Sequence, residues 1–208
     1  PTVVPSEHFN TVLYSGTGAE QAITGVGFQP DFVWVKHRQD ARSHGLVDSV
    51  RGATITLSPN STAGEVTLSQ GLKSFDADGF TLGTDQTIFN EGGGTPQHVA
   101  WNWKAGNATL GTGDFTQGTI ASTCSRNVDA GFSIVSYTGA GASNAGSTVG
   151  HGLSAKPDLI IIKIRIDNYT GKVYNSISGA EKYFDWASTA VLGDYTQHWN
   201  DTEPTSSV

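Results

Sequence analysis

The chain has 208 residues, a formal net charge of −7, few charged residues (15%) and a single cysteine. The acidic balance argues against nucleic acid as a partner, because phosphate binding needs a basic face. One cysteine excludes an intramolecular disulfide and a metal site built from several cysteines. No apolar run approaches the roughly 20 residues that span a bilayer, so we expect no membrane insertion. The 26 glycines, with many Thr, Ser, Val and aromatic residues, favour strands and tight turns and therefore an all-β fold.

The first half of the chain predicts a β unit over residues 1–106. Apolar and polar residues alternate from Phe9 to Tyr14, which predicts a first strand. Pro30-Asp31 then leads into four consecutive large apolar residues, Phe32 to Val35, followed by Lys-x-Arg. Such a run is typical of a strand that is buried on both faces, so we expect this strand to be central in its sheet.

Two further segments close this unit. Ser74–Gly83 places aromatic residues on both sides of an Asp-x-Asp-Gly turn and predicts a hairpin. In Val99–Lys104, alternation places Val99, Trp101 and Trp103 on one face. We expect that face to belong to the core.

A second unit is predicted over residues 132–208, after a Gly/Thr/Ser-rich connector (107–131) that we expect to hold one edge strand. Phe132–Gly141 repeats Phe9–Gly18 with identical spacing. Similar segments that recur in the same order indicate internal duplication.

The central strand of the first unit also returns. Pro157-Asp158 precedes the apolar run Leu159–Ile162 and a second Lys-x-Arg. Beyond this run the offset between the copies stays constant, so Ser176–Ala180 falls on Ser49–Ala53.

These repeats predict two homologous, β-sandwich-like (jelly-roll-like) units in tandem. Each Pro-Asp strand is expected to be central and covered on both faces. Aspartate in place of Val33 or of Ile161 is therefore expected to prevent folding, because an unpaired charge would be buried.

The second unit is incomplete in sequence. Nothing after Gly179 matches the hairpin of residues 74–83 or the strand of residues 99–104. A β unit that lacks its closing strand has an open edge, which invites pairing with a neighbour. We therefore expect residues 132–208 to be completed by another chain or by the first unit. The residues expected at that contact are Tyr183, Phe184, Trp186 and Trp199.

Asp76 and Asp78 are the candidate metal ligands. Their Asp-x-Asp-Gly pattern resembles the first half of a calcium loop, but the bidentate glutamate is missing at the required spacing. Asp-Gly is also an ordinary turn, and the six histidines form no zinc motif. The pattern favours a turn, with no metal and no cofactor.

Catalysis would need paired carboxylates. Asp76 with Glu91, or Glu65 with Asp78, would serve as the acid and base of a glycosidase if the pair lay at the required separation. Sequence alone does not place them there, and we expect no enzymatic activity.

Tryptophans could also bind sugar rings through their aromatic faces. Trp34 lies inside the apolar run and is assigned to the core, as are Trp101 and Trp103. Trp186 and Trp199, in the unmatched tail, are the candidate surface platforms.

Several segments match a known domain in order. They are Tyr14–Gly18, Gly27–Lys36, Asp48–Gly52, Ser74–Gly83, Val99–Gly106, Gly131–Gly139 and Val149–Leu153. The chain resembles a recurrent β domain of unknown function in virion proteins of tailed bacteriophages, especially marine phages and cyanophages. The likeness fades beyond Lys163, and the family supplies no catalytic residues.

The resemblance implies a structural or host-contact part of the virion, assembled in the host cytoplasm. A tail fibre, a spike and a capsid-surface fibre are all compatible with it. The implied partners are other virion proteins and further copies of this chain, with a host surface glycan as an outside ligand. The alternative function is a glycan-binding module or polysaccharide depolymerase of a phage adhesin.

Overall fold

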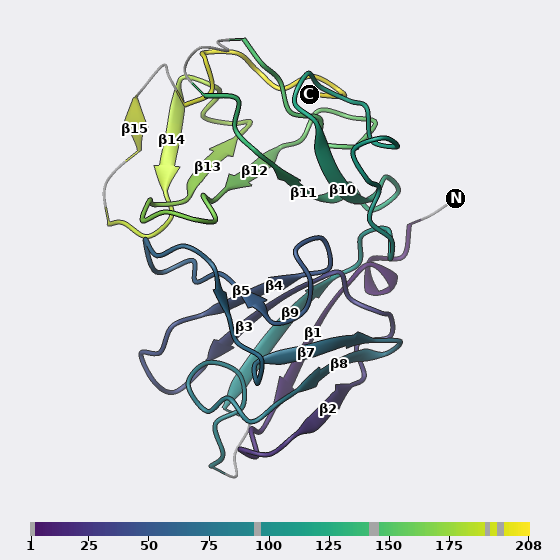
Figure 1. The fold of residues 1–208 in the computed structure, drawn as a ribbon, viewed down its shortest axis with the longest axis vertical. Helices are drawn as coiled ribbons and strands as arrows, with labels where there is room; N and C mark the ends of the chain where they lie inside the picture. Colours follow the sequence, from purple (N-terminus) through teal and green to yellow (C-terminus); the bar gives the residue numbers. More distant parts are fainter. Residues whose placement is uncertain (1–2, 94–96, 142–145, 190–191, 195–197) are drawn as a thin grey trace.

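The computed structural model describes residues 3–93, 97–141, 146–189, 192–194 and 198–208. Within these ranges the chain forms strands joined by turns, and a single 3-10 turn, η1 (Pro5–Glu7), is the helical element. No described helical segment is long and apolar enough to cross a membrane. The expected all-β fold is confirmed, and Figure 1 shows it as two parts stacked along the long axis of the molecule.

The first part is a sandwich of two antiparallel sheets. The larger sheet has the strand order β1 (Phe9–Tyr14), β9 (His98–Trp103), β3 (Phe32–His37) and β4 (Gly45–Asp48). The smaller sheet has the order β2 (Gln21–Thr24), β8 (Gly79–Leu82) and β7 (Leu72–Asp76). A short pair, β5 (Ile55–Thr56) and β6 (Val66–Thr67), completes this part. The predicted central strand, β3, and the predicted hairpin, β7–β8, are both confirmed.

The core of the first part lies between its two sheets. Val33 and Val35 of β3 are 0% exposed and pack in one cluster with Phe80 of the smaller sheet. Because side chains alternate along a strand, Phe32 and Trp34 lie on the other face of β3, where they are half-buried.

Strand β9 presents a different face to this core from the one predicted. His98, Ala100 and Asn102 are fully buried, whereas Trp101 and Trp103 are half-buried on the opposite face. The assignment of the tryptophan face to the core was wrong. Both faces of β9 are covered, and hydrophobicity alone does not say which neighbour covers which face.

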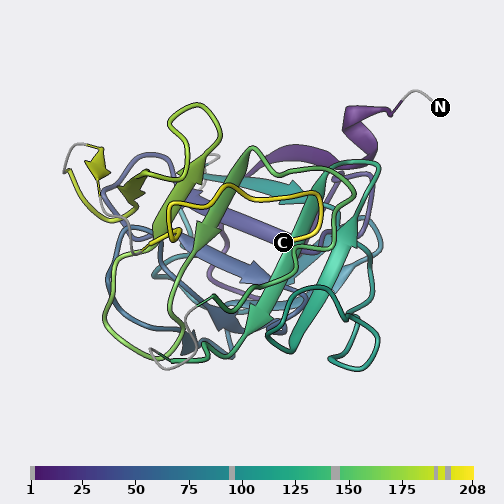
Figure 2. The same ribbon diagram turned by 90° about the horizontal axis from the view of Figure 1, so that it is seen from above.

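The second part contains two separate sheets. β10 (Ser122–Asn127), which lies in the predicted connector, pairs with β11 (Phe132–Tyr137). The other sheet has the order β12 (Leu159–Ile162), β13 (Lys172–Asn175), β14 (Lys182–Asp185) and β15 (Gly193–Asp194). Figure 2 shows this part from above, and no described strand pairs with both β11 and β12.

The hairpins β3–β4 and β12–β13 have the same register. Phe32 pairs with Asp48 in the first, and Leu159 pairs with Asn175 in the second. In both, the strand pairing continues for three more residues without a shift. The two hairpins therefore share one strand register over their whole length.

The position of β12 in its sheet differs from that of β3. β12 is an edge strand, and the side chains of Leu159 and Ile161 are 59% and 43% exposed. The expectation of a central, doubly buried strand was wrong for this copy. β12 is at the edge because no described strand pairs with it in the way that β9 pairs with β3.

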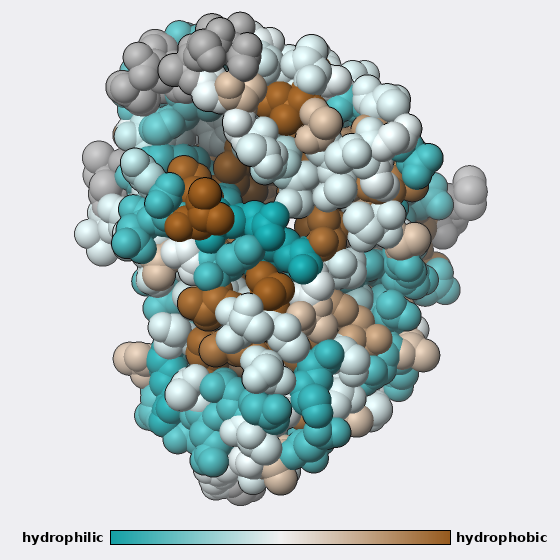
Figure 3. Space-filling view, in the orientation of Figure 1, coloured by the Kyte–Doolittle hydropathy of each residue, from teal (hydrophilic) through white to brown (hydrophobic). Residues whose placement is uncertain are grey.

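Aromatic side chains join the two parts. Trp34 lies edge-on to Trp186, with ring centroids 5.6 Å apart, and Phe132 lies 6.2 Å from Phe32 and 6.1 Å from Trp103. The second face of the larger sheet is therefore covered by the second part. Figure 3 shows apolar surface gathered along this junction.

An ion pair also crosses the junction. Arg165 donates to both carboxylate oxygens of Glu65, at 2.9 and 2.8 Å, and the Glu65 amide donates to the Arg165 carbonyl at 2.6 Å. The hydrogen bond from Arg165 is the main cause that lowers the pKa of Glu65. These contacts hold the segment after β12 against the first part.

Candidate functional site

The free edge of β12 is the most unusual surface of the described chain. Its four residues are Leu159, Ile160, Ile161 and Ile162, without a charge, proline or bulge among them. Proteins usually protect an edge strand by such features, because its unpaired backbone groups invite pairing with another chain. We therefore take this edge as the candidate functional site.

Backbone hydrogen bonds show which groups of β12 are directed outward. The Ser176 amide donates to the Asp158 carbonyl at 2.9 Å. Since residues alternate in an antiparallel ladder, Ile160 and Ile162 are also bonded to β13, and the N–H and C=O groups of Leu159 and Ile161 point away from it.

The C-terminal segment covers one face of the β12–β13 sheet. Tyr174 of β13 is fully buried, and its hydroxyl donates to Glu203 Oε2 at 2.6 Å. Its ring lies 5.7 Å from that of Trp199. The same Glu203 accepts a hydrogen bond from the Ala180 amide. In this way residues 199–208 occupy the position that the smaller sheet occupies in the first part.

The four predicted contact residues lie in different surroundings. Trp186 packs on Trp34 of the first part. Trp199 packs within the second part, where its Nε1 donates to the Lys182 carbonyl at 3.1 Å. The Tyr183 ring lies 4.2 Å from that of His198, and Phe184 is 40% exposed. Among the described residues, Trp186 is the one of the four whose ring packs on a ring of the first part.

The candidate calcium ligands bind the turn to its neighbours. The two carboxylate oxygens of Asp78 accept hydrogen bonds from the amides of Gly25 (3.0 Å) and Gly27 (2.6 Å). These bonds lower the pKa of Asp78. Asp76 accepts hydrogen bonds from the hydroxyls of Ser74 and Thr81. Each carboxylate therefore has its own local partners, as a hairpin turn requires.

The carboxylates considered for glycosidase chemistry are also held by separate partners. Glu65 is bound by Arg165 at the junction, and Glu91 contacts Arg42 beyond the end of β3. The structure thus brings neither predicted pair together through a hydrogen bond or an ion pair of the described residues.

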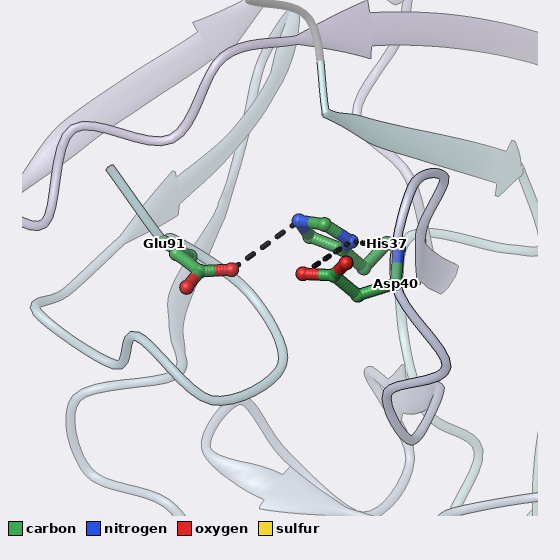
Figure 4. A group of neighbouring side chains, drawn as sticks. All are labelled: His37, Asp40 and Glu91. Atoms are coloured by element: carbon green, nitrogen blue, oxygen red, sulfur yellow. Dashed lines mark hydrogen bonds and ion pairs between the residues drawn. The ribbon is translucent and has the colours of Figure 1, made fainter. Parts of the chain in front are cut away.

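A cluster that the sequence did not indicate lies beyond the end of β3. His37, Asp40 and Glu91 bring three potential ligand atoms within 4.8 Å of one another (Figure 4). His37 is only 2% exposed, and its Nε2 lies 3.3 Å from Glu91 Oε2. His37 and Asp40 lie about fifty positions from Glu91 in the chain, and no local sequence motif predicts a contact over that separation.

The hydrogen bonds of His37 favour a charge network over a metal centre. The Asp40 amide donates to His37 Nδ1 at 2.9 Å, so Nδ1 must carry a lone pair and a neutral ring holds its proton on Nε2. That nitrogen lies 3.3 Å from Glu91 Oε2 without a hydrogen bond to it, and once protonated it has no free lone pair for a metal. Arg42 already supplies a cation, since it contacts Glu91 and lies 3.7 Å from Asp40.

His98 lies behind this cluster and is fully buried. Its ring stacks on Tyr14 with centroids 4.9 Å apart and meets His37 edge-on at 4.9 Å. Burial is the main cause that lowers the pKa of His98 from 6.5 to about 4, and the positive charge of Arg42 adds to it. Burial likewise raises the pKa of Tyr14, whose hydroxyl donates to the Phe89 carbonyl. At neutral pH His98 is therefore a neutral core residue.

Two hollows lie along the junction. The larger, of about 350 Å³, is lined by residues that include Pro5, Phe9, Trp103 and Phe132. The smaller, of about 110 Å³, lies among Trp34, His44, Pro59, Asn60 and Trp186. Neither is lined by a pair of carboxylates.

Comparisons with known proteins identify one family. No curated protein and no solved structure matches the chain. A family model described as a domain of unknown function (DUF7483) matches residues 4–208, which is nearly the whole sequence. The chain therefore belongs to this family of domains of unknown function.

Proposed function

We propose that this protein is a non-enzymatic structural component of a bacteriophage virion, and that it acts by assembly and surface display. The observation that carries the proposal is the unprotected edge of β12, where Leu159 and Ile161 are 59% and 43% exposed. Apolar side chains on an unpaired edge are costly in water and favour association with another chain. The resemblance of the sequence motifs to phage virion domains supports the placement in a particle.

An edge strand of the first part provides a contrast to β12. β1 is also at an edge, but Asn10 Oδ1 accepts a hydrogen bond from the Thr11 amide at 2.9 Å. One outward-pointing donor of β1 is therefore already occupied. No equivalent side chain is bonded to the Leu159 or Ile161 amide among the described residues, which supports β12 as the assembly edge.

We further propose that the two parts are tandem copies of one β unit. Their hairpins share the same register, and the same side-chain hydrogen bond closes each of them. Ser49 Oγ donates to Asp31 Oδ1 at 2.7 Å, and Ser176 Oγ donates to Asp158 Oδ1 at 2.7 Å. A duplicated unit that has lost its closing strand would present the open edge observed at β12.

Sedimentation velocity over a wide range of protein concentration tests the assembly function. The native chain is expected to associate, and Ile161→Lys is expected to weaken association because an edge lysine opposes strand pairing. Ile177→Lys is the matched control: Ile177 lies in the turn after β13, is 98% exposed and is expected to leave association unchanged. A native chain that stays monomeric at all concentrations and is missing from purified particles would refute the proposal.

A glycan-binding adhesin is the second candidate. The observation that favours it is the hollow between Trp34 and Trp186, in which Asn60 supplies a polar group. The two indoles meet edge-on, so part of their faces is used in packing. Binding to a panel of bacterial surface glycans that is lost in Trp186→Ala and retained in Trp199→Ala would establish this function.

A further inference from the structure

The larger sheet of the first part contains a strand, β9, for which no described strand of the second part takes the equivalent place, and this difference can be located at the level of single backbone groups. In the first part, β9 lies between β1 and β3 and is antiparallel to both. By sequence, β11 corresponds to β1 and β12 corresponds to β3. No described strand pairs with both β11 and β12.

The free edge of β12 corresponds to the edge of β3 that binds β9. The Ser49 amide donates to the Asp31 carbonyl, which places Val33 and Val35 in the ladder with β4. The Arg38 amide donates to the Gln97 carbonyl at 2.6 Å, so the alternate residues Phe32 and Trp34 pair with β9. Leu159 and Ile161 occupy the equivalent positions of β12.

The free edge of β11 corresponds in the same way to the edge of β1 that binds β9. The Lys104 amide donates to the His8 carbonyl at 2.8 Å, so the alternate residues that follow His8, including Val12, pair with β9. Val135 is the counterpart of Val12 in β11.

The partner of β11 lies on the opposite side. In β10, Cys124 exchanges both backbone hydrogen bonds with Leu110, at 2.8 and 3.1 Å. Its groups therefore point away from Val135, with which it is aligned across the strand pair. It follows that the N–H and C=O of Val135 point away from β10.

A hydrogen bond between side chains connects the two free edges. Arg165, just beyond β12, donates from Nη1 to the Ser136 hydroxyl of β11 at 2.9 Å. This contact holds the ends of the two edges near one another, and within the described residues no backbone hydrogen bond joins β11 to β12.

We propose that the position between β11 and β12 receives an extended segment of another polypeptide, which binds as an antiparallel strand and takes the place that β9 has in the first part. This inference deepens the proposed assembly function by naming the form of the partner. The segment has apolar residues at every second position, as β9 has Val99, Trp101 and Trp103. By the pairing of β9 with β1 and β3, two of these residues lie opposite Leu159 and Ile161.

Such a strand completes the sheet on both sides. Its backbone groups bond to the outward groups of Leu159 and Ile161 on one side and of Val135 on the other. Its apolar side chains lie beside Phe132 and Ile134, as Trp103 and Trp101 lie beside Phe9 and Thr11 in the first part. Main-chain bonding of this kind gives affinity, and alternate side chains give specificity.

The experiment adds a synthetic peptide of residues 97–106 to the intact protein and measures amide hydrogen exchange. The amides of Leu159, Ile161 and Val135 are expected to slow by about tenfold or more, because each gains a backbone partner. A peptide of the same composition in scrambled order, without the alternation, is the matched control and is expected to leave these amides unchanged.

Ile161→Pro is the variant that isolates the backbone contact. The Ile161 N–H points away from β13, so proline is tolerated at this edge without loss of the β12–β13 ladder. It is expected to weaken peptide binding by about tenfold or more through loss of one donor. Leu159→Pro removes the neighbouring outward donor and serves as the second variant if the first does not fold.

The result separates this inference from the assembly function. Protection of the Leu159 and Ile161 amides without protection of Val135 would show simple edge-to-edge pairing, which refutes insertion but leaves assembly in place. Peptide binding that Ile161→Pro and Leu159→Pro do not affect, or no peptide binding at all, would also overturn the inference. A native chain that does not self-associate in the sedimentation experiment and is missing from purified particles would instead contradict the proposed function itself.

Discussion

The hairpins β3–β4 and β12–β13 agree in their hydrogen bonds and differ in their surroundings. Asp48 Oδ1 accepts from the amides of Val50 and Arg51, and Asn175 Oδ1 accepts from those of the two residues in the same positions. Yet Val33 is 0% exposed on a central strand, whereas Ile160, at the same position of β12, is half-buried on an edge strand. The local sequence therefore builds the hairpin, and a distant strand decides whether the hairpin is buried.

The turns of the two hairpins also agree. Each turn contains a glycine with positive φ, Gly52 at 103° and Gly179 at 75°, and each glycine amide bonds to the carbonyl four residues earlier. Beyond the turns the parts diverge, because no described element of the second part corresponds to β7, β8 or β9.

The largest effect is expected from a charge in the core of the first hairpin. Val33→Asp would bury an unpaired carboxylate and should abolish folding. Ile161→Asp, which the sequence alone also predicts to be disruptive, should leave a folded protein because that side chain is 43% exposed. Soluble yield and near-UV circular dichroism measure both. Equal loss of structure in the two variants would contradict the contrast between the hairpins.

A smaller effect is expected at the aspartate that begins each hairpin. Asp31 is fully buried and accepts hydrogen bonds from the Ser49 hydroxyl (2.7 Å) and from the amides of Ala105 (2.8 Å) and Asn107 (3.1 Å). Asp31→Ala should lower the free energy of unfolding by about 3 kcal/mol or more, because buried donors lose a charged partner.

The matched variant is Asp158→Ala. Asp158 is exposed, and its side chain accepts a hydrogen bond from the Ser176 hydroxyl. Its loss should cost about 1 kcal/mol. Urea unfolding compares the two, and costs of similar size would show that burial does not separate these positions.

The two parts should also differ in their response to acid. Burial holds the pKa of His98 at about 4, below its ordinary value of 6.5. Between these values the unfolded chain binds a proton that the folded chain does not, so the free energy of unfolding should fall as the pH drops from about 6.5 to about 4. The full loss is of order 3 kcal/mol. His98→Phe should flatten this part of the stability curve, and an unchanged slope would contradict the assignment.

In the second part the acid response should occur at lower pH. The hydrogen bond from Lys156, followed by those from Tyr174 and the Ala180 amide, lowers the pKa of Glu203 from 4.5 to about 2. The folded chain therefore stays ionised where the unfolded chain takes up a proton, and this stabilisation should be lost as the pH falls from about 4.5 to about 2. Amide exchange near Tyr174 reports it, with Glu203→Gln as the variant that should remove the dependence.

The smallest effect is expected from a chelator. Because Asp76 and Asp78 are bound to local hydroxyl and amide donors, EDTA should leave the unfolding temperature unchanged. A fall of several degrees that calcium restores would show that these carboxylates bind a metal. Calorimetry with and without added calcium provides the measurement.

The sequence by itself determined the elements that depend on neighbouring residues. Alternation, turn residues and the repeated Pro-Asp runs predict the strand β1, the hairpin β7–β8 and the two Pro-Asp strands β3 and β12, because short-range geometry and turn chemistry act within a few residues. Asp76 and Asp78 could be assigned to a turn for the same reason.

Only the tertiary structure decided what covers each strand. Trp103 of β9 packs on Phe132 of the second part, Tyr174 is covered by residues 199–208, and His37 lies beside Glu91 of another loop. These contacts join residues that are far apart in the chain, and apolar character does not specify the neighbour. The open position beside β12 follows from the same physics, since backbone groups need a partner and no described strand of the second part takes the place of β9.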